Sequence, residues 1–241
     1  MEDEAKYALN VKQVMDFMHR IMMHHAMWFG EVYHQLGRER AMEILDTAFT
    51  NSSNIQLSRL SKVLGFEIKD GIPAPIANLP EEKLNALRDA LAANWLAGDG
   101  IWFQAVESAM GMDEAKRCND SCWAQFSPFE AWSIKRMLNL PEEAGLDGLK
   151  KALSQRLYAY VNKQSFREES DSSFVFVMND CRVQSARKRK GMDDYPCKSA
   201  GIVEYREFAR AIDSRITTQC ICCPPDKHDE SHYCAWKFTI G

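Results

Sequence analysis

The apolar residues follow different spacings in the two parts of this chain. Up to about residue 165 they recur every three or four positions, which is the spacing of an amphipathic helix. From Phe166 onward short runs of aromatic and β-branched residues take over, as in residues 174–178. We therefore expect an α+β protein, with a helical domain over residues 1–165 and a small α+β domain over residues 166–241.

Capping residues and breakers predict where the helices of the first part begin and end. Asn10 is a typical N-cap and Gly37 a typical C-cap for the first helix. Each Pro-Glu-Glu triplet, at Pro80 and at Pro141, has the composition of a first helical turn. The pattern thus predicts helices over residues 10–37 and 39–64, a loop over residues 71–80, a helix after Pro80 and a helix from Pro141 to about residue 162.

The two predicted helical hairpins resemble one another at a fixed offset of 74 residues. Trp28-Phe29 corresponds to Trp102-Phe103, and Gly37 corresponds to Gly111, with no gap over about 37 residues. Residues 28–64 and 102–138 are therefore candidate repeats, although two unrelated helical hairpins would also share such a pattern. Duplicated hairpins could pack as a pseudo-symmetric bundle.

The second part reads as a strand, a helix and a final hairpin. Residues 167–173 are polar and indicate a linker, and residues 179–186 could extend the strand that precedes them. A Pro-Pro turn at Pro224 separates the last two strands. The predicted elements are a strand at 174–178, a helix at 199–212, and strands at 215–223 and 233–240.

Four cysteines surround that final hairpin and form the strongest chemical signal in the chain. Cys197 precedes the helix, Cys220 and Cys223 end one strand, and Cys234 begins the next. Thiolates are the preferred ligands of tetrahedral zinc, so we expect a closed structural zinc site. The other interpretation is that these cysteines are small buried apolar residues. Three further side chains could replace one of the four ligands: Cys222, His228 and His232.

The cysteine spacing resembles that of the vinyl-reductase domain, a module also found in the sensory region of phenol-responsive bacterial regulators. In that pattern a helix-opening Cys is followed by Glu after 22 residues, by Cys after two more and by a last Cys after seven. The corresponding residues here are Cys197, Cys220, Cys223 and Cys234, with Cys in place of Glu and a final interval of ten. The resemblance covers residues 170–241 and implies these four zinc ligands. It also implies a homodimer, because such modules often dimerise.

The whole chain is similar to an uncharacterised bacterial and archaeal family described as "cytosolic protein", and more distantly to the 2-amino-thiazoline-4-carboxylate hydrolase family. Five segments carry this resemblance: residues 28–29, 119–123, 181–184, 195–198 and 234–236. Neither resemblance defines a reaction. The second, more distant resemblance leaves open that the protein is a hydrolase of a small heterocyclic or amide substrate.

Aromatic residues of the helical part suggest a ligand pocket. If the repeats pack about a pseudo-axis, Trp28 and Trp102 could line an apolar pocket for a planar molecule, with His25 at its polar end. Both tryptophans could instead be core residues. Arg182 could bind a ligand carboxylate, and Cys181 could act as a nucleophile if its pKa is lowered. We therefore predict a small-molecule-binding protein, with a hydrolase as the alternative.

The overall composition excludes several classes of partner. The net charge of −4 and the pI of about 5.9 give no general attraction for nucleic acid or anionic membranes. No apolar run reaches the roughly 18 residues of a membrane-spanning helix, and the acidic start does not have the layout of a signal peptide. We expect a cytoplasmic protein, in which eight cysteines are free or metal-bound rather than paired in disulfides.

Overall fold

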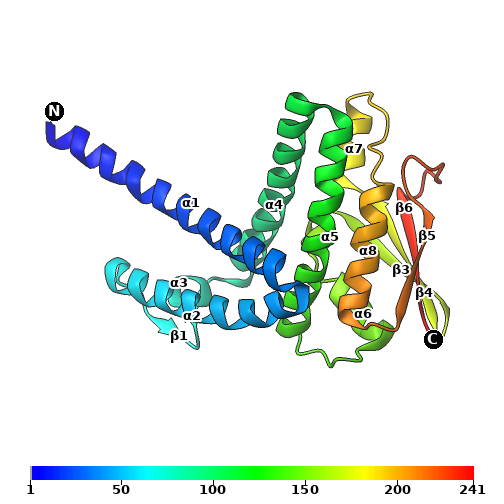
Figure 1. Ribbon diagram of the computed structural model, residues 1–241, viewed down its shortest axis with the longest axis horizontal. Helices are drawn as coiled ribbons and strands as arrows, with labels where there is room; N and C mark the ends of the chain where they lie inside the picture. The colour runs from blue at the N-terminus through cyan, green and yellow to red at the C-terminus, as the bar shows by residue number, and fades with distance from the viewer. Residues whose placement is uncertain (1) are drawn as a thin grey trace. The chain divides into compact units, whose positions relative to one another are not determined.

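A computed structural model describes residues 2–241 and confirms a mixed α+β protein (Figure 1). The chain divides into two compact units, Met1–Leu79 and Pro80–Gly241, which are described separately below. The domain boundary expected near residue 165 lies inside the second unit, within β3 (Lys163–Ser170), the first strand of the large sheet.

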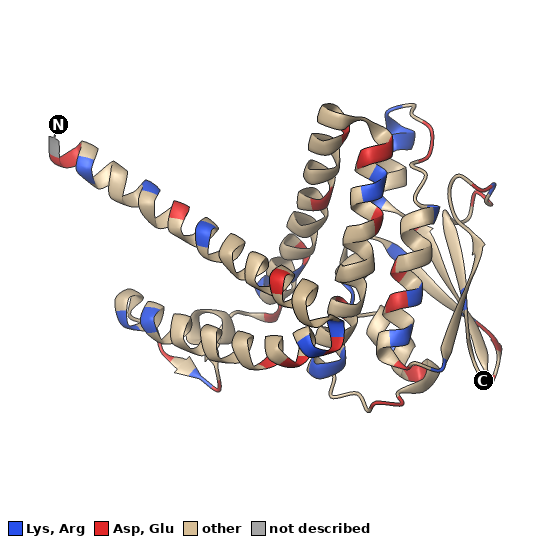
Figure 2. Ribbon diagram, in the orientation of Figure 1, with Lys and Arg blue, Asp and Glu red and all other residues tan. Residues whose placement is uncertain are grey.

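Unit 1 is built on two long helices, α1 (Glu2–Leu36) and α2 (Arg38–Leu64), which meet at Gly37. Gly37 has φ 80 and ψ 167, a conformation that glycine adopts without steric cost. Helix α1 begins eight residues before Asn10, so the predicted N-cap is wrong. Charged residues are sparse along most of α1 (Figure 2).

The remainder of unit 1 is a small hairpin followed by a short helix. Strands β1 (Ile68–Lys69) and β2 (Ile72–Pro73) pair across Asp70-Gly71, both at positive φ as in a type I′ turn. Helix α3 (Ala74–Ala77) therefore lies within the segment predicted to be a loop. Among the described residues of unit 1, only Ala41 and Leu45 are buried.

Unit 2 begins with a second helical hairpin, formed by α4 (Glu81–Met110) and α5 (Met112–Met137). The predicted helix start after Pro80 is confirmed. Gly111 joins the two helices with φ 93 and ψ 171, close to the geometry of Gly37. Ala41 and Ala115, which correspond at the offset of 74, are both buried, and each donates its backbone amide to the carbonyl of the joining glycine. The two joints of the proposed repeats thus share one local structure.

The rest of unit 2 forms a four-stranded antiparallel sheet and the helices that pack on it. Its strands follow the order β3-β4-β6-β5. Figure 1 shows α5, α6 and α8 on the same side of this sheet. The elements are α6 (Gly145–Leu153), η1 (Leu157–Tyr160), β3 (Lys163–Ser170), β4 (Ser173–Asp180), α7 (Arg182–Arg189), α8 (Lys198–Ile212), β5 (Ile216–Cys222) and β6 (Cys234–Ile240).

Several sequence predictions in this region are corrected. The segment predicted to be a linker, residues 167–173, mostly belongs to β3, and the predicted strand extension at residues 179–186 instead turns into α7. Pro141 does not start a helix, because α6 begins at Gly145. The helix at 198–212 and both strands of the final hairpin agree with their predicted positions to within one residue.

The core of unit 2 lies between the sheet and α5, α6 and α8. Alternate residues of β4 and β6, such as Phe176 and Trp236, face this layer, and the two are direct partners in the ladder. Tyr205 of α8 stacks on Trp236 with ring centroids 4.7 Å apart. The start of α8, the end of β5 and the start of β6 meet beside this core, and the residues at these ends pack against it.

Candidate metal centre

The cysteines of the last 45 residues lie at the ends of three neighbouring elements. Cys197 occupies the N-cap position of α8, Cys220 lies in β5, Cys223 directly follows β5, and Cys234 begins β6. A bulge between Cys220 and Cys222 shifts the β5 register against β6. A bulge redirects the side chains that follow it, and Cys223 is accordingly buried, with an exposed fraction of 2%.

Two of the thiols are in direct contact. The sulfur atoms of Cys197 and Cys223 lie 3.5 Å apart. Hydrogen bonding to Cys223 lowers the pKa of Cys197, and the same interaction, together with one to Cys234, raises the pKa of Cys223 far above its ordinary range. Cys223 therefore acts as the thiol donor and Cys197 as the more acidic partner. Cys234 is buried beside them.

Cys220 is half-buried against the same core and lies at the edge of this group. Burial raises its pKa to about 11, and the nearby Lys198 ammonium acts in the opposite direction. In the described part of the chain, no group of three or more His, Cys, Asp or Glu side chains is already arranged to hold a metal ion. Cys223 nevertheless contacts both Cys197 and Cys234, so the structure brings three of the four predicted thiols together and leaves Cys220 at the margin.

The spare ligand candidates have other partners. His232 Nε2 lies 3.4 Å from Cys222 Sγ, and its Nδ1 lies 3.0 Å from Ser231 Oγ. His228 pairs with Asp194 through Nε2 at 2.8 Å, and this contact raises the pKa of His228. Neither histidine is joined to Cys197 or Cys223 by these contacts.

Three polar residues hold the thiol pair in place. The Gln184 side-chain amide donates to the Tyr195 carbonyl and accepts from the Tyr195 amide, both at 2.8 Å, and its Nε2 also lies 3.5 Å from Cys197 Sγ. Lys198 Nζ contacts both carboxylate oxygens of Asp226, at 2.9 and 2.8 Å. The Lys198 backbone amide donates to the Pro224 carbonyl at 2.9 Å. These contacts fix the start of α8 against the end of β5.

Gly201 permits the close approach of α8 to β6. A Cβ atom at this position would lie 2.6 Å from the Trp236 ring and 3.7 Å from Cys223 Sγ. Only a residue without a side chain lets the first turn of α8 lie this close to the indole. The roles of Gln184, Lys198, Asp226 and Gly201 were not predicted from the sequence, because they depend on contacts between distant segments.

The residues predicted to form a ligand pocket do not gather around the thiols. Trp28 on α1 and Trp102 on α4 are 62% and 70% exposed. His25 makes an edge-to-face contact with Phe49 of α2. Arg182 is exposed at the start of α7, where its backbone amide donates to Asn162. The pocket between the two tryptophans stays a prediction.

A second buried polar group, not predicted from the sequence, lies among the helices of unit 2. Arg156 is 2% exposed and forms ion pairs with Glu130 at 2.8 Å and with Glu204 at 2.7 Å. Glu130 also accepts the backbone amide of Leu157 at 3.0 Å, whereas burial raises the pKa of Glu204 to about 7. Aromatic rings surround the guanidinium, the nearest being Phe208 at 4.8 Å. This triad joins α5, the segment before η1, and α8.

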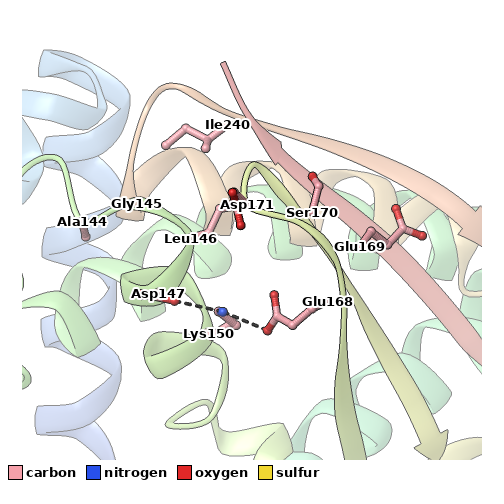
Figure 3. Close-up of a pocket in the computed structure, with 10 residues that line it drawn as sticks. All are labelled: Ala144, Gly145, Leu146, Asp147, Lys150, Glu168, Glu169, Ser170, Asp171 and Ile240. Atoms are coloured by element: carbon pink, nitrogen blue, oxygen red, sulfur yellow. Dashed lines mark hydrogen bonds and ion pairs between the residues drawn. The ribbon is translucent and has the colours of Figure 1, made fainter.

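A surface groove of unit 2 lies elsewhere. It has a volume of about 620 Å³ and is formed by α6 and the turn between β3 and β4 (Figure 3). Lys150 bridges Asp147 and Glu168 there, both at 2.9 Å, and Glu169 pairs with Lys237. Its acidic side chains are thus largely paired, and none of the predicted site residues lines it.

The fold and the thiol group define unit 2 as a cysteine-rich α+β domain. Residues 77–240 match a family of unknown function, DUF6125, which covers nearly all of unit 2. The chain belongs to this family. No curated protein matches the chain. Across the described residues, none of the helices is both long and apolar enough to span a bilayer.

Proposed function

We propose that unit 2 binds one zinc ion through Cys197, Cys220, Cys223 and Cys234, and that the clamped domain serves to bind a small molecule. The observation that carries the metal proposal is the 3.5 Å separation of the Cys197 and Cys223 sulfurs. Tetrahedral zinc with Zn–S bonds of about 2.3 Å places its sulfur ligands roughly 3.8 Å apart. The contact between α8 and the end of β5 therefore has nearly the spacing that a zinc ion requires.

The surroundings of the pair suit a thiolate site. Cys223 and Cys234 are buried, so a bound ion would be shielded from water, as in closed structural sites. The Gln184 amide and the Lys198 ammonium supply the hydrogen bond and the positive charge that thiolate ligands favour in their outer shell. Completing the site requires the Cys220 side chain to turn toward the pair.

The resemblance to the vinyl-reductase domain supports the same ligand set. The pattern expects one cysteine at a helix start, two ligands at the end of a strand and one on the returning strand. Cys197, the Cys220–Cys223 pair and Cys234 occupy these places in the fold. By the same resemblance, the domain would act as a ligand-binding module in the cytoplasm.

The environment of Cys181 supports binding over catalysis. Burial raises the pKa of this thiol to about 12, so it is protonated at neutral pH and is a poor nucleophile. The aromatic rings around the half-buried Trp95 pack on one another, with Trp123 and Tyr158 stacked 5.5 Å apart beside it. The high pKa of Cys181 is thus the reason to favour a binding protein over a hydrolase.

A dithiol switch is the second candidate, and the same sulfur contact favours it. Two thiols 3.5 Å apart need to approach by about 1.5 Å to reach disulfide bonding distance. A two-electron oxidant such as an external disulfide or a peroxide, which takes up the two thiol hydrogens, would then join Cys197 to Cys223 and exclude the metal. The two candidates differ in whether the purified protein carries zinc or an intramolecular disulfide.

Metal analysis of the purified full chain tests the proposal. We expect about one zinc per chain, reduced to less than about a quarter by Cys223→Ser and unchanged by Cys118→Ser, which alters an exposed cysteine on α5. Less than about half an equivalent in the wild type would overturn the zinc assignment. A mass lower by two hydrogens without reductant would then support the dithiol switch.

The ligand-binding part has its own test. A thermal-shift screen of small planar compounds should find stabilising ligands that the protein leaves chemically unchanged. Turnover that disappears in Cys181→Ala would contradict the binding assignment and favour the hydrolase alternative.

A further inference from the structure

Helix α1 presents a continuous apolar seam along its length. Seam residues alternate at intervals of four and three, the heptad spacing that lets two helices pack side by side. The only polar seam residue before Gln35 is His25. The apolar seam positions are Tyr7, Val11, Val14, Met18, Ile21, Trp28 and Val32, and Met15, Met22 and Leu36 widen the stripe along one edge.

Most of this seam is not covered within unit 1. Every side chain from residue 3 to residue 22 is exposed, and among the described residues of the unit only Ala41 and Leu45 are buried. A unit of this size needs a real apolar core to hold its fold against chain entropy. Unit 1 therefore buries too little apolar surface to stabilise its fold, and the apolar surface that stays exposed lies on α1.

The exposed area matches what a stable dimer requires. The seam side chains, mostly between 48% and 72% exposed, offer about 1,000 Å² of mainly apolar surface per copy, against roughly 800 Å² per partner in a standard interface. At 35 residues α1 is about 50 Å long, enough to span such an interface by itself.

We propose that α1 is a self-association element, in which the seam packs against the α1 seam of a second copy in antiparallel orientation. A two-fold axis near Ile21 would place the acidic turn at Asp3-Glu4 opposite the start of α2, where Arg38 and Arg40 flank Glu39. A parallel pair would instead bring the two acidic turns together. Opposed helix dipoles also favour the antiparallel arrangement.

The charges of α1 favour a protein partner over a membrane surface. Helices that lie on anionic membranes carry many Lys and Arg residues on their polar face. The described charged residues of α1 are mixed and not predominantly basic: the basic ones are Lys6, Lys12 and Arg20, and the acidic ones are Asp3, Glu4, Asp16 and Glu31. The DUF6125 match begins at residue 77, so this element lies outside the segment that defines the family.

The mass of the full chain in solution tests the proposal. Light scattering during size-exclusion chromatography should give about 55 kDa, twice the chain mass of 27.6 kDa. Ile21→Glu should weaken dimerisation at least about 100-fold, because it places two like charges at the axis. The matched control Gln13→Glu adds the same charge outside the seam and should leave the mass unchanged. A wild type of 27.6 kDa at all concentrations would overturn the proposal.

Disulfide cross-linking then tests the orientation. In a background with Cys118→Ser and Cys122→Ser, Ile21→Cys should form a cross-linked dimer on mild oxidation, because both copies bring this position to the axis. Val14→Cys should not cross-link, because it would lie opposite Trp28 of the second copy. Efficient cross-linking through Val14→Cys would indicate parallel seams and overturn the antiparallel assignment. Circular dichroism verifies that each variant keeps its helix content.

Discussion

The buried Glu130–Arg156–Glu204 triad makes protein stability depend on pH in a way that Glu204→Gln should remove. The triad holds two carboxylates and one guanidinium, all nearly inaccessible to water. Glu130 is satisfied by Arg156 and by a backbone amide, so Glu204 is the carboxylate that takes up a proton. Its pKa rises from 4.5 to about 7, mainly because burial disfavours the charged form.

The size of the effect follows from this shift. A group whose pKa is raised on folding favours the folded state below its unfolded pKa, here 4.5, and loses that contribution as the pH rises through about 7. Between pH 5 and pH 8 the loss amounts to about 2.5 kcal/mol, at 1.36 kcal/mol per pKa unit. Glutamine has the same shape and no charge, so the unfolding free energy of the variant lacks this component.

Urea denaturation of the wild type and Glu204→Gln, followed by tryptophan fluorescence at pH 5, 6, 7 and 8, measures the difference. As the pH rises from 5 to 8, the unfolding free energy of the variant should increase by about 2.5 kcal/mol relative to that of the wild type. Glu82→Gln, on the exposed first turn of α4, should run parallel to the wild type. If the difference in unfolding free energy between Glu204→Gln and the wild type stays constant with pH, the assignment of the proton to Glu204 is refuted.

Two further predictions concern the thiol centre and its surroundings. Gly201→Ala should lower the unfolding free energy in urea denaturation by about 1–3 kcal/mol, because the added methyl group would overlap Trp236. Gly30→Ala, at a position with open space around it, should cause no loss. Equal effects of the two substitutions would contradict the close packing at Gly201. Asp194→Asn should destabilise the protein below pH 6.5, and the difference in urea midpoint between the variant and the wild type should shrink as the pH rises through the raised pKa of His228. A difference in midpoint that does not change with pH would contradict a contribution from the His228–Asp194 ion pair.

Local signals in the sequence predicted much of the fold. Gly37 and Gly111 marked both helical joints, and Pro80 marked the start of α4, because glycine and proline act on the backbone at their own positions. The final hairpin was also predicted correctly, since a Pro-Pro turn separates two runs of alternating strand residues.

The errors concern segments whose structure depends on distant partners. Strand β3 is an edge strand with many charged residues, so it resembles a linker until its pairing with β4 is known. The N-cap prediction at Asn10 failed because the helix-favouring residues before it extend α1 to Glu2. The buried triad could not be predicted, because Glu130 and Glu204 lie 26 and 48 residues from Arg156 and no local pattern connects them.

For the candidate site, the sequence predicted which thiols lie near one another better than how each is oriented, and the zinc stays a prediction. Cys197, Cys223 and Cys234 converge as their places around the hairpin suggested. The bulge that redirects Cys223 and leaves Cys220 at the margin depends on pairing between β5 and β6. Such a register shift leaves no clear signal in one sequence.

X-ray absorption at the zinc edge of the purified protein tests the thiol centre most directly, because it reports the atoms bound to the metal. The proposed site predicts a first shell of about four sulfur atoms at roughly 2.3 Å. Absence of zinc, or a first shell dominated by oxygen or nitrogen, would contradict a structural thiolate site at the junction of α8, β5 and β6.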